Sequence, residues 1–331
     1  MPTRRRFLSI LAASCAAALP LARAHASTAA SISAWKGTAM GALASLTLVH
    51  PDRPRARALI DTCVGEIARL ESIFSLYRND SALSRLNAAG ELANPPQELA
   101  ELLSFGLSLS ALSAGAFDPT IQPLYRLYHE RFARNPAIGP TRRDIARVLQ
   151  VVDYRAVEVR SDCIRLHRPG MALTLNGIAQ GYITDRITDW LRAAGFDNVL
   201  VDLGEARALG HRADGHSWQA AVRDPRDATR TVFDLPLGDG PASALATSAG
   251  YGTPLGADPR THHLLDPRTG ESANHYLSVS VIAPRATLAD GLSTALYVSA
   301  PLDAQLVLRD YPSARAYMID AAGRVSRPGP I

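Results

Sequence analysis

The chain has 331 residues, of which 47% are hydrophobic, 6% aromatic and 20% charged, an ordinary globular composition with enough length for a sizeable core. It carries 35 basic and 31 acidic residues, but four arginines and no acidic residue fall within the first 26 positions, so the rest is balanced at 31 of each. We therefore expect no basic surface patch and no nucleic-acid partner.

The first 26 residues have the features of a twin-arginine export signal. Thr3–Leu8 contains the paired arginines, an apolar stretch runs from Phe7 to about Leu21, and Ala24–Ala26 fits a small-x-small cleavage site. The stretch is shorter than the roughly 20 residues of a membrane-spanning helix. An uncleaved anchor or a buried first helix is the less favoured alternative, and Cys15 is a poor lipidation site. The sequence predicts a signal peptide over 1–26, a mature domain over 27–331 and a periplasmic location.

Hydrophobic periodicity predicts the elements of the mature chain. Alternation favours a first strand over Gly37–Val49, and apolar residues spaced three and four apart favour helices over 55–76 and 97–113. Thr141 and Asp144 have the spacing of a capping box that opens another helix. The later segments, in chain order, are strands at 156–160 and 163–167, a helix at 178–194, strands at 198–202, 218–222, 232–235 and 277–282, helices at 288–299 and 303–309, and a strand at 314–319.

These strands outnumber the helices and mostly follow one another without helical crossovers. The order favours an α+β fold of mixed or antiparallel sheets with packed helices over a doubly wound parallel sheet. Cys63 falls in a helical pattern and Cys163 in a strand pattern. They could pair in an oxidising compartment, but we expect two buried, separate thiols, and no Cys/His spacing matches a zinc site.

Asp290 and Thr294 are four residues apart in a predicted helix and so share one face of it. A carboxylate and a hydroxyl in that arrangement are hard oxygen ligands that suit Mg²⁺. The alternative is a helix cap, because Thr287 and Asp290 also have the spacing of a capping box. The residues alone favour the cap.

The segment Asn176–Gly181 opens a predicted helix after a predicted strand. A glycine-containing turn at a helix N-terminus presents free N–H groups to a phosphate. The alternative is an ordinary turn between a strand and a helix, which is the commoner meaning of so short a pattern.

Seven short motifs follow one another along the mature chain: Gly37–Gly41, Phe74–Asn87, Gly115–Thr120, Leu175–Tyr182, Ala246–Tyr251, His262–Gly270 and Ala289–Thr294. In this order and spacing they resemble the ApbE family of FAD:protein FMN transferases, over about residues 35–296. The resemblance implies a Mg²⁺ site made by Asp290, Thr294 and the backbone carbonyl of Gly177. It thereby reverses the preference for a helix cap at Asp290.

The resemblance also implies a set of residues that hold FAD: Met40, Tyr77, Ala116, Phe117, Asp118, Thr174, Gln180 and Leu264. Phe117 and Met40 could equally be core residues, and Asp118 could belong to a turn. Thr174 and Gln180 stand where the family usually has Asp and Lys, and Lys36 is the chain's only lysine. This variant loop is similar to that of the NosX-like branch, which is associated with nitrous-oxide respiration.

His263 precedes two leucines, as the family's histidine precedes two apolar residues, and the resemblance implies that it accepts or orients the proton of the target hydroxyl. A structural histidine is the alternative. The implied reaction transfers FMN from FAD to a Thr or Ser hydroxyl of a target flavoprotein in an electron-transfer chain of the periplasm or membrane, with Mg²⁺ as cofactor and AMP as the leaving group. The competing functions are a periplasmic FAD pyrophosphatase and a flavin-binding protein without turnover.

Overall fold

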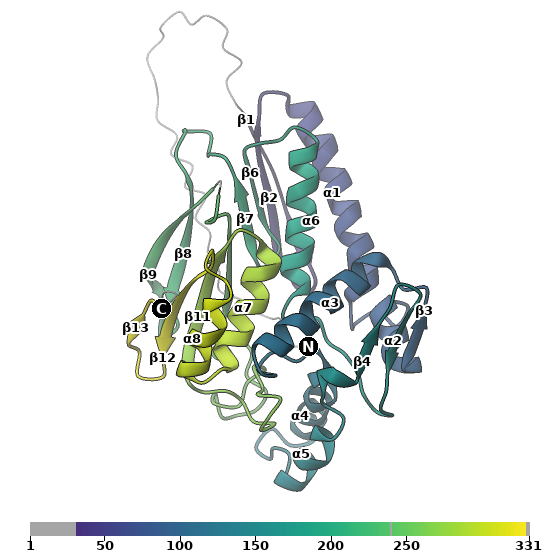
Figure 1. Cartoon of the computed structure of the whole chain (residues 1–331). Coiled ribbons are helices and arrows are strands. Elements are labelled where there is room, and N and C mark those ends of the chain that lie inside the picture. Colours follow the sequence, from purple (N-terminus) through teal and green to yellow (C-terminus); the bar gives the residue numbers. More distant parts are fainter. Residues whose placement is uncertain (1–30, 239, 329–331) are drawn as a thin grey trace, which may run out of the picture.

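The computed structural model describes residues 31–238 and 240–328 of the chain (Figure 1). The predicted signal peptide and Cys15 lie outside the described residues, so the expectations of export and cleavage stay predictions. Among the residues that are described, no helix combines the length and the apolar character needed to cross a bilayer.

The strands form three sheets, and every strand pair among the described residues is antiparallel. The large sheet contains, in spatial order, β1 (Ser31–Ala39), β2 (Ala42–His50), β6 (Val199–Asp202), β7 (Ala206–Leu209), β10 (Ala244–Ser248), β11 (Tyr276–Ala283), β12 (Arg315–Asp320) and β13 (Val325–Ser326). The smaller sheets consist of β3 (Glu91–Ala93), β5 (Cys163–Leu166) and β4 (Val157–Val159), and of β8 (Trp218–Asp224) with β9 (Asp227–Leu237). The predicted α+β class is confirmed.

The helices are α1 (Arg53–Phe74), α2 (Ala82–Ala89), α3 (Gln97–Leu112), α4 (Gln122–Arg134), α5 (Arg142–Leu149), α6 (Ala179–Ala193), α7 (Ala286–Val298) and α8 (Pro301–Arg309). Helices α1, α6 and α7 cover one face of the large sheet, and the β8–β9 ribbon covers the other (Figure 1). The strands serve both layers because alternate side chains point to opposite faces. Val199 and Val201 lie in the helix-side core, whereas Leu200 lies in the ribbon-side core.

Residues 37–49, predicted as one strand, are two strands of a hairpin. The chain turns at Met40 and Gly41, whose φ angles are 48° and 75°, and Ala39 pairs with Ala42. A two-residue turn with positive φ at both positions is the usual link between antiparallel strands. Asn-Gly is its common sequence, so methionine at the first position hides the turn in a pattern that otherwise alternates.

The other predicted segments match observed elements with shifts of a few residues, and the capping box at Thr141 and Asp144 is formed. Helices α2 and α4 were not predicted. Helix α4 buries only Leu124 and Tyr128, so its sequence lacks the regular row of apolar residues that predicts a helix. The expectation of two buried thiols is right for Cys63, whose pKa is raised to about 12 chiefly by burial. It is wrong for Cys163, which is partly exposed on β5 and whose thiol donates to a carboxylate on β3.

Candidate active site

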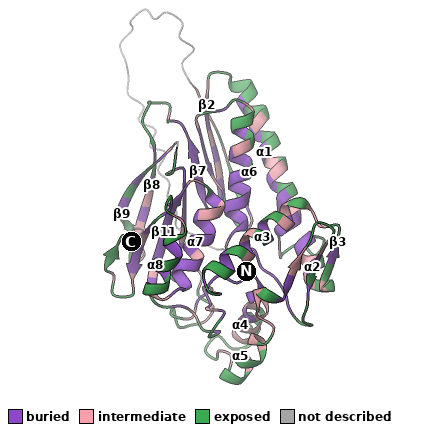
Figure 2. Cartoon of the chain, viewed as in Figure 1, coloured by how far each residue is buried: buried purple, intermediate pink, exposed green. Residues whose placement is uncertain are grey.

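Helices α6 and α7 run antiparallel with their backbones in close contact, and Figure 2 shows both as largely buried. A methyl group at Gly181 would lie 2.4 Å from the carbonyl oxygen of Ala286 and 2.9 Å from Cβ of Asp290. Four residues earlier, a methyl group at Gly177 would lie 3.1 Å from Oγ1 of Thr294. At Gly181 only glycine allows this approach, and at Gly177 a methyl group would be tightly packed, so the start of α6 faces the predicted ligand pair on α7.

Asp290 is not a helix cap. Helix α7 begins at Ala286 with Arg285 in the capping position, so Asp290 lies in the second turn and the capping-box alternative is wrong. Its buried carboxylate accepts a hydrogen bond from the backbone N–H of Gly181 at 3.1 Å. That N–H belongs to the first turn of α6, where N–H groups have no partner within their own helix.

Hydroxyl groups extend this cluster of oxygens. Oγ of Ser248, at the end of β10, lies 2.8 Å from Oγ of Ser293 and 3.3 Å from Oγ1 of Thr294. Ser293 also lies 2.9 Å from the carbonyl oxygen of Asp290, to which it donates. The start of α6, the middle of α7 and the end of β10 therefore meet at a site lined with oxygen atoms.

The donor atoms at this site fit Mg²⁺. Within residues 31–238 and 240–328, no three His, Cys, Asp or Glu side chains gather as a metal-binding group. The cluster instead offers the carboxylate of Asp290, the hydroxyl of Thr294 and the backbone at Gly177. Mg²⁺ accepts such a set, because it is usually bound by one or two carboxylates and completes its coordination with water and phosphate oxygens.

Phe117 lies against the turn at Gly177 that precedes α6. A methyl group at Gly177 would be 3.2 Å from its ring, and the ring is buried in the main core together with Ala116. Asp118 caps a short 3₁₀ turn, where it accepts bonds from the N–H of Thr120 at 2.7 Å and of Tyr154 at 3.1 Å. Burial raises the pKa of Asp118, although these bonds oppose the shift. Phe117 therefore lies in the core, and Asp118 belongs to a turn, as the alternatives to cofactor binding expected.

The two histidines have different surroundings. His262 is buried: its Nδ1 accepts from the N–H of Leu264 at 3.3 Å, and its Nε2 lies 3.5 Å from the hydroxyl of Tyr297 on α7. Burial lowers the pKa of His262. His263 is only half-buried, and its backbone is held by the N–H···O bond to Thr253 and by the hydroxyl of Tyr125, which donates to its carbonyl. His262 is thus a packing residue, and His263 is the more accessible of the pair.

The histidine loop, residues 249–275 between β10 and β11, is bonded to α7 one turn beyond Thr294. The N–H of Gly250 donates to the hydroxyl of Tyr297 at 3.2 Å, and a methyl group at Gly250 would lie 2.4 Å from the His262 ring. Tyr297 follows Thr294 by three residues on α7. The loop that carries His263 is therefore anchored close to the oxygen cluster.

Residues 40–318 match the model of the ApbE family. The chain belongs to the ApbE family. An FAD:protein FMN transferase of Salmonella typhimurium is 31% identical over 290 residues, covering 83% of this chain and 80% of its own length. Another, from Klebsiella pneumoniae, is 29% identical over 314 residues and covers 90% and 87%.

Solved ApbE structures have the same fold. The flavin transferase ApbE of Vibrio cholerae superimposes with a TM-score of 0.78 at 25% identity, covering 90% of this chain and 96% of its own. The ApbE protein of Thermotoga maritima gives 0.78 at 28% identity, with coverages of 90% and 97%.

The two departures from the usual ApbE pattern are both buried and bonded within the protein. The hydroxyl of Thr174 accepts from the N–H of Asn176 at 3.2 Å and so shapes the glycine turn. The amide of Gln180 donates to the carbonyl of Leu203 at 3.0 Å, and a methyl group at Gly204 would lie 2.5 Å from that amide. Gln180 thereby ties the start of α6 to the turn between β6 and β7.

Met40 and Tyr77 each lie near the C-terminal end of α1. The N–H of Met40 donates to the carboxylate of Glu71 in the last turns of α1. Tyr77 follows that helix, and its side chain is 72% exposed. An exposed ring of this size is available to stack on a flat ligand. Leu264 is instead buried in the main core, next to the histidine pair.

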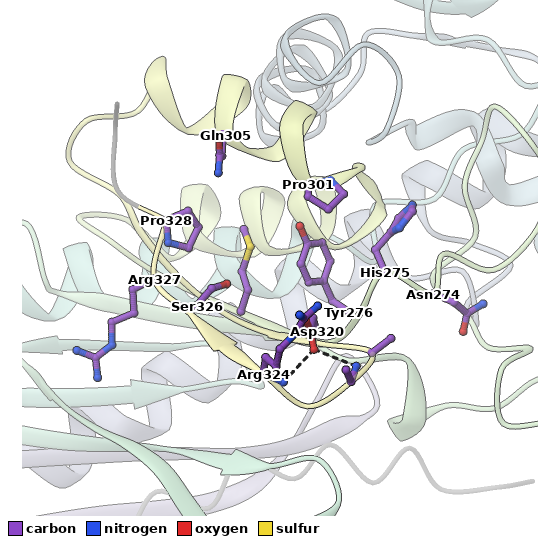
Figure 3. A pocket seen from close by; sticks show the side chains of 13 residues that line it. Asn274, His275, Tyr276, Pro301, Gln305, Asp320, Arg324, Ser326, Arg327 and Pro328 are labelled. Carbon is purple, nitrogen blue, oxygen red and sulfur yellow. Dashed lines mark hydrogen bonds and ion pairs between the residues drawn. The ribbon is translucent and has the colours of Figure 1, made fainter.

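Two cavities lie away from these residues. One of about 690 Å³ is bounded by α8, β12 and the β12–β13 turn, where Arg324 pairs with Asp320 at 2.7 Å (Figure 3). The other, of about 370 Å³, lies between α4 and residues 254–257. Neither is lined by any residue that the sequence predicted for the site.

Sequence reasoning missed several contributors to the site. Ser248 and Ser293 stand inside motifs that were recognised, so their hydroxyls could have been added to the oxygen cluster. The role of Tyr125 could not be predicted, because its hydroxyl donates to the backbone carbonyl of His263, a partner that does not depend on the side chain at that position.

Proposed function

We propose that this chain is a Mg²⁺-dependent FAD:protein FMN transferase. The observation that carries the proposal is the approach of Gly177 to Thr294, one turn from Asp290, beside the first turn of α6. This places metal-type oxygens beside a helix N-terminus, whose positive dipole end favours a pyrophosphate. The matched relatives from Salmonella typhimurium and Klebsiella pneumoniae carry the same activity in their names.

In the proposed reaction, a Thr or Ser hydroxyl of the target protein attacks the phosphorus on the FMN side of FAD. A new O–P bond forms, the P–O bond to AMP breaks, and the hydroxyl proton leaves to a base. Asp290, Thr294 and the carbonyl of Gly177 would hold Mg²⁺, which supplies charge neutralisation at the pyrophosphate. The N-terminal end of α6, where the helix dipole is positive, would favour the phosphates at this site.

His263 is the proposed base or orienting group for the target hydroxyl. It is half-buried, with Nδ1 turned into the protein, and its backbone is fixed on both sides, which holds the residue at this point of the loop. Its neighbour is less suited, because burial lowers the pKa of His262 and both of its ring nitrogens face protein groups.

The target would be a flavoprotein of an electron-transfer chain in the periplasm or membrane, as in nitrous-oxide respiration. The location rests on the paired arginines of Thr3–Leu8 and the cleavage pattern after them. Replacing Arg4 and Arg5 by lysine should retain the protein in the cytoplasm. Recovery of that variant from the periplasm at the normal level would refute twin-arginine export.

Intact mass spectrometry tests the activity itself. The protein is incubated with FAD, Mg²⁺ and a candidate target, and the target should gain the mass of one FMN. Free FMN and AMP without a modified target would support a pyrophosphatase instead. Unchanged FAD would leave a flavin-binding protein.

A further inference from the structure

Asp185 lies on α6 one turn after Gly181, and its side chain is fully buried. One carboxylate oxygen accepts from the N–H of Ala286 at 2.9 Å. The other accepts from the N–H of Thr287 at 2.9 Å and from its hydroxyl at 2.6 Å. Ala286 and Thr287 are the first two residues of α7. Asp185 therefore caps α7 from a neighbouring helix, in place of the local Ser, Thr or Asp that usually does so.

Arginines compensate the buried charge. Arg207 on β7 reaches Asp185 and Asp189 with the same nitrogen, at 2.8 Å in each case. Arg285 lies 3.2 Å from Asp185 and 2.7 Å from Asp189. Two carboxylates thus face two guanidinium groups, as a buried ionic group requires if its desolvation is to be offset. The network fastens α6 and the start of α7 to the central sheet.

The two helices cap each other. Asp290 of α7 accepts from the first turn of α6, and Asp185 of α6 accepts from the first turn of α7. Both contacts lie on one face of α6, four residues apart and therefore about 6 Å along its axis. If α7 slid along α6, both bonds would break and Thr294 would move away from Gly177.

We propose that Asp185 is a positioning residue for the metal site: it fixes the register between α6 and α7 that brings Gly177 to Asp290 and Thr294. The inference rests on the proposed function, because it assumes that these residues hold Mg²⁺. Asp185 does not itself ligate the metal. It acts through the first turn of α7, as groups behind the direct ligands do in other metal sites.

Asp189 provides a matched control. It lies on the same helix, pairs with the same two arginines at similar distances and is more exposed. Within the described part of the chain its carboxylate accepts from those arginines and from no backbone N–H of α7. Asp185→Asn and Asp189→Asn both remove one charge from the network. Only the first weakens the cap on α7.

Binding of Mn²⁺ to the FAD-loaded protein, followed by electron paramagnetic resonance, is the primary measurement. We expect Asp185→Asn to weaken Mn²⁺ binding by about 10–100-fold, and Asp189→Asn to leave it near the wild-type value. In transfer assays, Asp185→Asn should raise the half-saturating Mg²⁺ concentration to a similar extent, and excess Mg²⁺ should restore the rate. Thr287→Val, which loses only the hydroxyl bond to Asp185, should shift both quantities in the same direction by less.

Unchanged Mn²⁺ affinity in Asp185→Asn would overturn the inference, as would a rate loss that excess Mg²⁺ does not relieve. If Asp185→Asn does not fold, unchanged Mn²⁺ affinity in Thr287→Val overturns it. An equal shift in Asp189→Asn would also overturn it, because charge rather than capping would then be responsible. If the wild-type protein binds Mn²⁺ and transfers no FMN, the proposed function fails while the binding comparison still decides the role of Asp185.

Discussion

The carboxylate of Asp290 on α7 accepts a hydrogen bond of 3.1 Å from the backbone N–H of Gly181 on α6. The residue proposed as the charged metal ligand is therefore also a contact between the two helices that form the site. Its two roles can be separated by substitutions that differ in charge and in hydrogen bonding.

Asp290→Asn keeps an oxygen that can accept from Gly181 but loses the charge. We expect a melting temperature near that of the wild type and a transfer rate at least about 100-fold lower at limiting Mg²⁺, because a charged ligand contributes several kcal/mol at such sites. Asp290→Ala should abolish transfer, and Thr294→Val, which loses a neutral oxygen, should be milder. Full activity of Asp290→Ala at limiting Mg²⁺ would remove the metal assignment.

Gly181→Ala would place a methyl group 2.4 Å from the carbonyl oxygen of Ala286 and so push α6 and α7 apart. We expect a loss of roughly 1–3 kcal/mol in the free energy of unfolding, together with a higher half-saturating Mg²⁺ concentration for transfer. Gly65→Ala on α1 is the control, since a methyl group there meets no atom within 4 Å. It should stabilise the protein by about 0.5–1 kcal/mol. Urea unfolding measures both, and equal effects of the two substitutions would contradict the close contact.

His263→Ala should lower single-turnover transfer by roughly 10²–10⁴-fold, the usual contribution of a general base, with FAD affinity nearly intact. His262→Ala should instead lower the melting temperature, because it removes a buried ring that contacts Gly250 and Tyr297. Flavin fluorescence titration and single-turnover assays on one preparation separate the two effects. Weaker FAD binding with an unaltered rate at saturating FAD would reject a catalytic role for His263.

Burial raises the pKa of Asp202 to about 6, above the value of about 3.9 expected in the unfolded chain. The folded state then holds the proton more tightly, so the free energy of unfolding should fall as the pH rises from about 4 to about 6. Asp202→Asn keeps an acceptor for the N–H of Gly204 and should remove this dependence. At pH 7 the variant should be more stable by up to about 2–3 kcal/mol, and equally stable below about pH 4. Urea unfolding across this range checks the sign.

The fold was largely predictable because most of its elements bury one regular stripe of apolar residues. Helix α6 buries Ile183, Ile187 and Leu191 at a spacing of four, and the pattern gave its bounds to within a residue. The β1–β2 turn was missed because Met40 adopts a positive φ, which is uncommon for a residue with a long side chain and is not expected from the sequence. Helix α4 was missed because few of its residues are buried.

Sequence spacing could place Asp290 and Thr294 on one helix face, but it could not show what faces them. The contact with Gly177 and Gly181 joins segments more than 100 residues apart. Glycine has no side chain from which a partner could be predicted. The role of Asp185 could not be predicted for a related reason, because it accepts from backbone N–H groups, which almost every residue of a sequence has.

The loop that carries His263 is held by two separate cores, because Leu264 lies in the main core and Leu265 in a small cluster beside it. Leu265 from the loop packs with Leu124 and Tyr128 of α4 and Ile145 of α5, in a cluster separate from the one beneath α6 and α7. Small clusters of this kind open more readily than a central sheet. Local unfolding of α4 and α5 would remove the contacts of Leu265 and the bond from Tyr125 to His263, while the packing of Leu264 and the bonds of the loop to Tyr297 remained. In that state the proposed metal ligands would stay in place while the proposed base had lost part of its support, so the population of the closed cluster would limit the fraction of molecules in which both are aligned.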